Sequence, residues 1–360
     1  MTSDATKRLS QLGQSLWLDN ITRDLLESGT LKRYIDEFSV TGLTSNPTIF
    51  DNAISRNSWY DTEIRAQLKA GASGEGLFFN LAVQDLSRAA DLFLPIHERT
   101  STVDGFVSLE VSPDLAYDTK ATVAQAKMLH AKAGKRNLFI KIPGTAEGLP
   151  AIEEAIFAGV PINVTLLFSK DQYVAAANAY MKGLERRVAA GLPTDVRSVA
   201  SLFVSRWDVA VTAQAPAALR NTLGMAVSRQ AYTAYRDILE SSRFQRLANL
   251  GARAQRLLFA STGTKDKAAS DTLYVSGLAA PNTVNTIPEE TLMAFADHGA
   301  ITRELPRDGG DAEAVLAEHV KAGIDLTALA ARLQSDGAES FVKSWNELLG
   351  AIDAKSKALA

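Results

Sequence analysis

Short β-rich runs that alternate with helical stretches are the feature of this 360-residue sequence that most constrains its fold. Helical patterns such as 117–133 and 170–190 separate consecutive runs. The runs expected to form strands span residues 15–20, 40–47, 105–113, 138–144, 161–169, 198–206, 256–264 and 272–278. Strands joined by helices form a parallel sheet, and eight such repeats are the number that closes a barrel. The sequence therefore predicts an α/β fold, a (β/α)8 TIM barrel with additional helices.

The length of the chain is compatible with one domain. A usual barrel takes about 250 residues, which leaves about 110 for additional helices. We place these around residues 48–98 and 208–249 and in the Ala-rich tail after Arg307. No Pro-, Gly- or Ser-rich linker divides the chain, and no internal repeat is visible. Residues 1–360 are therefore expected to form a single barrel domain with a C-terminal helical extension.

A doubly wound sheet is the main alternative fold, and it would carry a Gly-rich dinucleotide turn after an early strand. The glycine-rich run 71–76 follows a helical pattern and indicates a helix–helix loop. The run 144–148 does follow a strand, but it lacks the Lys-Ser/Thr ending of a phosphate-binding loop. The barrel is the better prediction.

Charge and composition exclude several classes of function. The net charge is −3, from 38 basic and 41 acidic residues, which argues against general nucleic-acid binding. The first residues lack an apolar signal core, and no apolar run approaches the length that spans a membrane. A cytoplasmic protein without membrane or nucleic-acid partners is expected. The sequence allows a homodimer but does not fix the oligomeric state.

The sequence indicates chemistry without a metal. The chain has no Cys, which excludes disulfides, thiolate catalysis and cysteine-bound metals. Its four His are isolated, and none has the paired spacing of a metal-binding helix, so we expect them on helix surfaces: His97, His130, His298 and His319.

Lys141 is the strongest candidate for a catalytic residue. It lies in an expected strand whose Leu138, Ile140 and Ile142 share one face, so Phe139 and Lys141 share the other. Burial disfavours the charged ammonium form of a lysine, and the neutral amine attacks carbonyl carbons to form a Schiff base. From this segment alone, a strand-end lysine that reaches solvent is the alternative.

Polar residues on neighbouring strands favour the catalytic interpretation. In a barrel, alternate residues face the lumen, and active sites lie at the C-terminal ends of the strands. Alternation sends apolar residues such as Leu109 and Leu166 outward. It places these polar residues on the lumen side: Asp19, Ser108, Glu110, Lys141, Asn163, Thr165 and Ser201. Barrel lumens are normally filled by bulky branched side chains. Two carboxylates beside a lysine supply the acid and base groups that Schiff-base chemistry needs.

Two segments resemble signatures of the transaldolase family. Residues 42–50, Gly-Leu-Thr-Ser-Asn-Pro-Thr-Ile-Phe, are similar to its Thr-Ser/Thr-Asn-Pro signature, and residues 138–148 are similar to its active-site lysine signature. The resemblance continues through 163–169 and 201–206 and covers about residues 15 to 288. Our count also places Lys141 on the fourth strand, as in that family.

The resemblance implies an enzyme of the pentose phosphate pathway that requires no cofactor. Such an enzyme transfers a dihydroxyacetone unit from sedoheptulose 7-phosphate to glyceraldehyde 3-phosphate, giving erythrose 4-phosphate and fructose 6-phosphate. Lys141 would form the Schiff base, Asp19 would act as acid and base, and Glu110 and Thr165 would hold a catalytic water. The implied substrate-binding residues are Thr44, Asn46, Asn163 and Ser201 for the dihydroxyacetone part, and Arg206 and Ser261 for the phosphate.

The sequence departs from the family pattern at one phosphate-binding position. The usual Ser-x-Arg is replaced by Ser-Thr-Gly-Thr-Lys at residues 261–265, so Lys265 is expected to supply the second cation. A lysine can hold phosphate as a point charge, without the fork of an arginine.

Two other functions remain open from the sequence. A related fructose 6-phosphate aldolase would use the same lysine but release free dihydroxyacetone. Those enzymes place Tyr where this chain has Phe203, which favours transfer. A non-catalytic sugar-phosphate binding protein would need no set of acid, base and amine, which Asp19, Glu110 and Lys141 provide.

Overall fold

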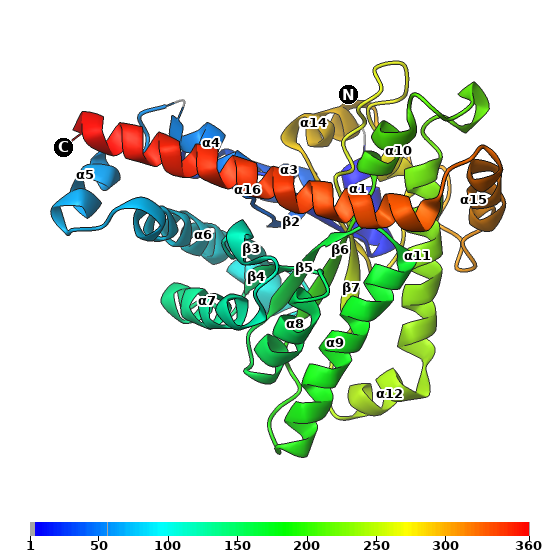
Figure 1. Ribbon diagram of the computed structural model, residues 1–360, viewed down its shortest axis with the longest axis horizontal. Coiled ribbons are helices and arrows are strands. Elements are labelled where there is room, and N and C mark those ends of the chain that lie inside the picture. The colour runs from blue at the N-terminus through cyan, green and yellow to red at the C-terminus, as the bar shows by residue number, and fades with distance from the viewer. Residues whose placement is uncertain (1–3, 56, 360) are drawn as a thin grey trace.

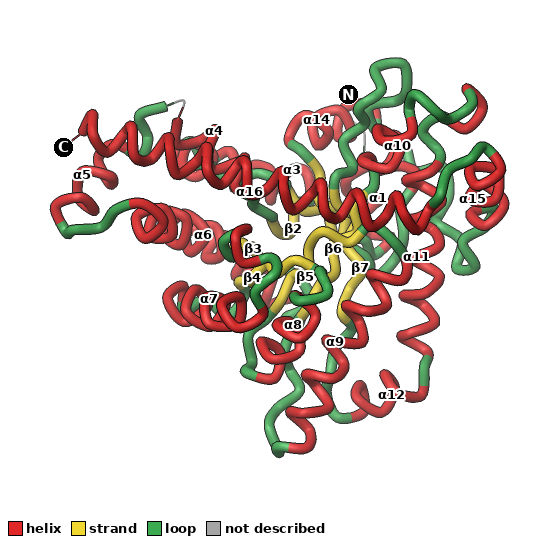
Figure 2. Tube along the Cα trace, viewed as in Figure 1, coloured by secondary structure: helices red, strands yellow, loops and turns green. Residues whose placement is uncertain are grey.

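The computed structural model describes residues 4–55 and 57–359, which fold around a closed barrel of eight parallel strands in the order β1 to β8. Figure 2 shows the strands gathered at the centre, with helices around them. The strands are β1 (Ser15–Leu18), β2 (Val40–Leu43), β3 (Val107–Glu110), β4 (Leu138–Pro143), β5 (Ile162–Leu167), β6 (Ser198–Phe203), β7 (Gln255–Ala260) and β8 (Val284–Ile287). The predicted (β/α)8 barrel is confirmed.

The last strand of the barrel is not where the sequence predicted it. Residues 272–278 contain the helix α13 (Leu273–Gly277), and β8 pairs with β7 and β1 to close the barrel. β8 has only four residues and carries two polar side chains, Asn285 and Thr286. The segment 273–278 is more apolar, and its composition favoured the wrong choice.

The helices surround the barrel, and the last one runs across one of its ends (Figure 1). The additional helices predicted around 48–98, around 208–249 and after residue 307 are α4 to α6, α10 to α12, and α15 and α16. In chain order the helices are α1 (Ala5–Leu12), α2 (Arg23–Glu27), α3 (Thr30–Phe38), α4 (Pro47–Ser55), α5 (Asp61–Lys69), α6 (Gly74–Arg99), α7 (Thr119–Ala133), α8 (Gly148–Phe157), α9 (Lys170–Ala189), α10 (Ser205–Val211), α11 (Leu223–Glu240), α12 (Ser242–Asn249), α13, α14 (Glu289–His298), α15 (Ala312–Lys321) and α16 (Leu326–Leu359). Within the described ranges, no helix combines the length and the apolar character needed to cross a bilayer.

Successive residues of the strands belong to two different cores. Val107, Leu109 and Ile140 pack in one core with apolar residues of the surrounding helices, and fully burying each such side chain contributes about 1.5–3 kcal/mol. The alternate residues fill the lumen, where the rings of Phe106 and Phe139 stack with centroids 4.1 Å apart. The predicted alternation is therefore confirmed for β3 and β4, and it leaves Lys141 on the lumen side.

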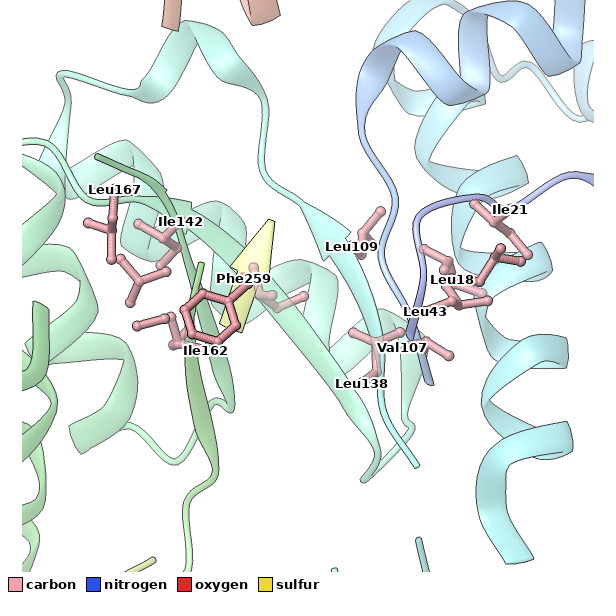
Figure 3. Packing of buried hydrophobic residues seen from close by; sticks show 14 of the residues in the cluster. Leu18, Ile21, Leu43, Val107, Leu109, Leu138, Ile142, Ile162, Leu167 and Phe259 are labelled. Carbon is pink, nitrogen blue, oxygen red and sulfur yellow. The ribbon is translucent and has the colours of Figure 1, made fainter. Parts of the chain in front are cut away.

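A β-bulge interrupts this alternation in β5. Val164 pairs with Ala200 of β6, but the next paired residue is Leu167, opposite Leu202. Leu166 adopts a left-handed conformation with φ +59°, which costs a residue with a side chain about 1–2 kcal/mol. Leu167 therefore takes the outward position beside Ile142, as Figure 3 shows, and Leu166 packs in the lumen-side core. The expectation that Leu166 faces outward is wrong, because simple alternation does not include the extra residue of a bulge.

The helix α16 runs across the barrel mouth and is fixed to it by hydrogen bonds. Figure 1 shows it crossing from the side of α15 to the side of α5. The Gln334 amide donates to the carbonyl oxygens of Gly144 and Leu166, just beyond β4 and within β5. Near its other end, Lys355 Nζ lies 2.8 Å from Asp61 Oδ1 on α5. The C-terminal extension therefore forms part of the mouth.

Candidate active site

A cavity of about 130 Å³ lies at the C-terminal ends of the strands. Most of the predicted site residues line it, and they come from different strands and from the loops that follow them. These residues are Asp19, Thr44, Asn46, Lys141, Thr165, Ser201, Phe203, Arg206, Ser261 and Lys265. The fold thus brings together residues that are as much as 246 positions apart in the sequence, from Asp19 to Lys265.

Lys141 projects from β4 into this cavity with only 5% of its surface exposed. Its Nζ lies 3.2 Å from Glu110 Oε2, because Glu110 on β3 pairs directly with Lys141 in the sheet. Nζ also donates to the carbonyl oxygen of Ser45 at 2.9 Å. The amine is therefore held in one position by two acceptors, and the alternative of a strand-end lysine that reaches solvent is not what the structure contains.

Burial controls the protonation of both carboxyl groups at the site. Burial raises the pKa of Glu110 above its ordinary value, and the nearby Lys141 opposes that shift. The pKa of Asp19 is raised for the same reason, with opposing effects from Lys141, from the Thr44 hydroxyl and from Lys265. Both groups take up a proton at higher pH than free carboxyl groups, as suits residues that exchange protons with a substrate.

Asp19 is oriented by a short chain of hydroxyl groups. Thr44 Oγ1 donates to Asp19 Oδ1 at 2.7 Å. The hydroxyl of Thr286 lies 2.7 Å from Thr44 Oγ1, and it is the donor there because Thr44 has already given its only proton to Asp19. Strands β1 and β8 and the loop after β2 together fix the carboxylate at the mouth.

A second polar chain runs along the wall of the lumen below the amine. Asn163 on β5 is fully buried and pairs with Lys141 in the sheet. Its Nδ2 donates to Ser108 Oγ at 3.2 Å, and its Oδ1 accepts from Ser201 Oγ at 2.7 Å. Asn163 lies behind the cavity lining. Because these two bonds use its oxygen and one of its amide hydrogens, the second amide hydrogen is the group that it can offer to a ligand.

Two buried oxygens beside Lys141 have no hydrogen-bond partner among the described residues. They are Glu110 Oε1 and Thr165 Oγ1. Buried polar atoms nearly always have a partner, so such a pair indicates a place where a water or a substrate hydroxyl is held. The two residues come from the strands on either side of β4, which carries the lysine.

The cationic side of the cavity is formed by Arg206, Ser261 and Lys265. The Arg206 guanidinium lies 5.4 Å from the centre of the Phe203 ring, and burial lowers the pKa of Arg206 although an arginine stays charged. Ser261 Oγ is 3.0 Å from Ser205 Oγ at the start of α10. Lys265 is exposed at the rim. One partly buried and one exposed cation therefore face the cavity.

Sequence reasoning missed some residues of the lining. Thr286 and Pro288 were missed because β8 was misplaced, although the run Thr-Ile-Pro resembles the Lys-Ile-Pro that ends β4. Phe341 of α16 was missed because no local pattern shows that a distant helix will cover the mouth. Its ring centre lies 5.9 Å from Lys141 Nζ. An apolar ring over the amine limits its contact with water.

Two of the four histidines do not lie on helix surfaces as expected. His97 is buried with Nδ1 2.8 Å from the Asp104 carbonyl oxygen, and buried His319 has Nε2 3.0 Å from Thr222 Oγ1. Both complete packing between elements. No group of three potential metal-ligating side chains is present in residues 4–55 and 57–359.

A larger cavity, of about 590 Å³, lies at the opposite end of the barrel. Among the described residues that line it there is no lysine, and its one carboxylate, Asp104, accepts hydrogen bonds from Ser15 and Trp17. That cavity therefore lacks a lysine amine that could act as a nucleophile. The smaller cavity combines the Lys141 amine, the Asp19 carboxyl group and two cationic side chains, which can attack a carbonyl carbon, move protons and hold an anionic group.

Known proteins match this chain over almost its whole length. A family model described as Transaldolase/Fructose-6-phosphate aldolase matches residues 16–352. A relative named Transaldolase from Arthrobacter sp. (strain FB24) is 43% identical over 357 residues, which cover 97% of this chain and 96% of the relative. Another, from Thiobacillus denitrificans, is 44% identical and covers 96% and 99% of the two chains. A protein named Transaldolase 2 from Nostoc punctiforme is 38% identical over the full length of both. On these matches, the chain belongs to the transaldolase/fructose-6-phosphate aldolase family.

Proposed function

We propose that this enzyme is a transaldolase. It transfers a dihydroxyacetone unit from sedoheptulose 7-phosphate to glyceraldehyde 3-phosphate in the pentose phosphate pathway, giving erythrose 4-phosphate and fructose 6-phosphate. The observation that carries the proposal is the buried Lys141 amine, 3.2 Å from Glu110, in a cavity that Asp19 also lines. The names of full-length relatives support the same activity.

The first half of the reaction forms an imine on Lys141. The amine attacks the C2 carbonyl carbon of the donor, its nitrogen loses a proton, and the carbonyl oxygen gains one to give a carbinolamine. Loss of water then gives the imine. Glu110 and Thr165 hold the water that carries protons in this step, which the unpartnered Glu110 Oε1 and Thr165 Oγ1 support.

The second half breaks and remakes a carbon–carbon bond. Asp19 takes the proton of the C4 hydroxyl as the C3–C4 bond breaks, and the bonding electrons move into the protonated imine. The aldose phosphate leaves, and an enamine stays on Lys141. The enamine then attacks the carbonyl carbon of the acceptor, Asp19 returns the proton, and hydrolysis of the new imine frees the lysine.

Polar residues around the amine bind the dihydroxyacetone part of the substrate. Thr44, Asn46 and Ser201 line the cavity, and the free amide hydrogen of Asn163 lies behind it. Phe203 supports transfer over the release of free dihydroxyacetone. Its ring presents no hydroxyl that could hold water near the enamine, and it packs against Phe168 with centroids 5.3 Å apart.

Arg206→Ala is expected to raise the KM for fructose 6-phosphate by about 10- to 150-fold, because charge-assisted hydrogen bonds contribute about 1.5–3 kcal/mol each. Lys265→Ala should raise it less, since Lys265 is exposed and has no fork. Steady-state kinetics test this, with Arg246→Ala on the exposed face of α12 as the control. Unphosphorylated fructose should be a poor donor that neither change affects. An equal loss with fructose and with its phosphate would instead make Arg206 structural.

Treatment with a chelator is expected to leave the transfer rate unchanged, because the protonated imine on Lys141 is the electron sink of the proposed reaction. The rate is compared before and after incubation with EDTA and dialysis. A loss of activity that a divalent ion restores would contradict the Schiff-base mechanism and favour a metal-stabilised enolate.

The organisation and surroundings of the enzyme are also proposals. We expect residues 1–360 to form one domain, which the hydrogen bonds of α16 to β5 and to the segment after β4 support. A cytoplasmic location, a homodimer and the absence of nucleic-acid partners stay predictions from the sequence.

A further inference from the structure

The bulge in β5 places a strained segment next to Lys141. Thr165 and Leu166 both lie between Val164 and Leu167, where β6 offers only Ser201 between the paired residues. A bulge redirects a side chain and is often found beside an active site. Here it leaves the Thr165 hydroxyl on the cavity and turns Leu166 into the left-handed conformation.

One side-chain amide holds this segment from outside the barrel. Gln334 Nε2 on α16 donates to the Leu166 carbonyl oxygen at 2.9 Å and to the Gly144 carbonyl oxygen at 3.0 Å. Gly144 N in turn donates to the Thr165 carbonyl oxygen at 2.8 Å. Both amide hydrogens of Gln334 are therefore used to tie the end of β4, which carries Lys141, to the bulge that carries Thr165.

The rest of the same helix face is shaped to bring Gln334 close. Gly337 lies over Leu166, and a Cβ on Gly337 would be 3.0 Å from Leu166 Cδ2, which is tighter than an ordinary contact. Phe341 follows one helical turn later and covers Lys141. Residues at spacings of three, four and seven share one face of a helix. This face is therefore fitted to the catalytic mouth.

We infer that Gln334 is a positioning residue that acts through Thr165. Its amide keeps Leu166 in the left-handed conformation, which aims the Thr165 hydroxyl at the place where the catalytic water is held. The inference rests on the proposed function, because it assigns Gln334 to the imine-forming step. It gives the C-terminal extension a role in the chemistry.

The test is a double-mutant cycle in which the rate of imine formation is measured. Enzyme in excess is mixed with fructose 6-phosphate, samples are reduced with borohydride over time, and the adduct on Lys141 is measured by mass spectrometry. Gln334→Met keeps the length of the side chain but removes both donors, and Ser335→Met on the exposed side of the same turn is its control. We expect Gln334→Met to slow adduct formation by about 10- to 100-fold, since a misplacement of about 1 Å can cost 100-fold. The KM for fructose 6-phosphate should change by less than about threefold, because in this assignment Gln334 contacts no substrate.

The combination with Thr165→Ala separates positioning from general support. If Gln334 acts through Thr165, the double variant is no slower than Thr165→Ala alone, because residues that share one role are not additive. If the two losses multiply, or if Gln334→Met lowers the Tm and leaves the rate unchanged, the inference is wrong.

Two further measurements keep the test decisive. If Gln334→Met fails to fold, Gly337→Ala presses a methyl group against the Leu166 side chain with the amide intact, and it should slow the same step by a smaller factor. A normal rate in Gly337→Ala would then contradict the inference. An adduct on another lysine in the wild type would overturn the proposed function instead, so the two failures are distinguishable.

Discussion

Replacing Lys141 with methionine is expected to abolish transfer and to leave the barrel folded. The barrel should stay folded because the unbranched apolar side chain of methionine fills the same space as lysine. Transfer should be lost because, among the described residues, no other amine lies within hydrogen-bond distance of Glu110 to replace Lys141. The variant leaves Glu110 Oε2 without its donor, which costs about 1–3 kcal/mol. Because burial already raises the pKa of Glu110, loss of the lysine lets this carboxyl group take a proton and avoids a buried charge.

The wild-type enzyme provides the positive measurement. Borohydride reduction in the presence of fructose 6-phosphate should add the mass of a reduced dihydroxyacetone unit at Lys141 and at no other lysine. Lys141→Met should give no adduct. The double variant Lys141→Met, Glu110→Gln is the control for folding. Its Tm should not fall as the pH is raised through the range where Glu110 of the single variant loses its proton, because an amide cannot become a buried charge. Residual transfer by Lys141→Met would remove the lysine from the mechanism.

Asp19→Ala is expected to slow cleavage of the carbon–carbon bond by about 10²- to 10⁴-fold, the usual contribution of a general acid or base. The imine should still form, because Glu110 and Thr165 remain. The borohydride adduct of the variant should therefore keep the whole sugar phosphate instead of dihydroxyacetone alone. Asp24→Ala, an exposed aspartate on α2, is the matched control and should behave as the wild type.

The protonation of Asp19 gives the same prediction a pH dependence. Burial raises the pKa of Asp19 above its ordinary value of 3.8. As the pH is lowered, Asp19 therefore becomes protonated at a higher pH than a free aspartate, and a protonated Asp19 cannot act as a base. The cleavage rate should therefore fall as the pH is lowered, and it should begin to fall at a higher pH than an ordinary aspartate would cause. A variant that loses substrate binding while keeping its cleavage rate would show that Asp19 is not the base.

Strand alternation predicted the candidate site where the strands are regular. Ser108 and Glu110 on β3, and Ser201 and Phe203 on β6, lie on the lumen side because each strand keeps its period of two. The method failed at Leu166, where one extra residue changes the direction of every later side chain in β5. The bulge contacts Gln334 on a distant helix, and the sequence of β5 alone does not reveal such a contact.

Elements that depend on distant partners were the least predictable. β8 is a strand because it pairs with β7 and β1, and its four residues alone carry a weak signal. The position of α16 depends on contacts with distant residues, among them the carbonyl oxygens of Gly144, just beyond β4, and of Leu166 in β5. Local periodicity predicted a helical tail and could not say what the tail covers.

Because α16 follows all eight strands in the sequence, it is also synthesised after them on the ribosome. All eight strands have been synthesised once Ile287 is added, but Gln334 and Phe341 follow roughly 50 residues later, about 2–10 s at 5–20 residues per second. A barrel that closes before α16 is in place leaves its reactive amine without a cover. A nascent chain is thus unable to hold a sugar phosphate away from water until α16 has been synthesised and lies across the barrel mouth.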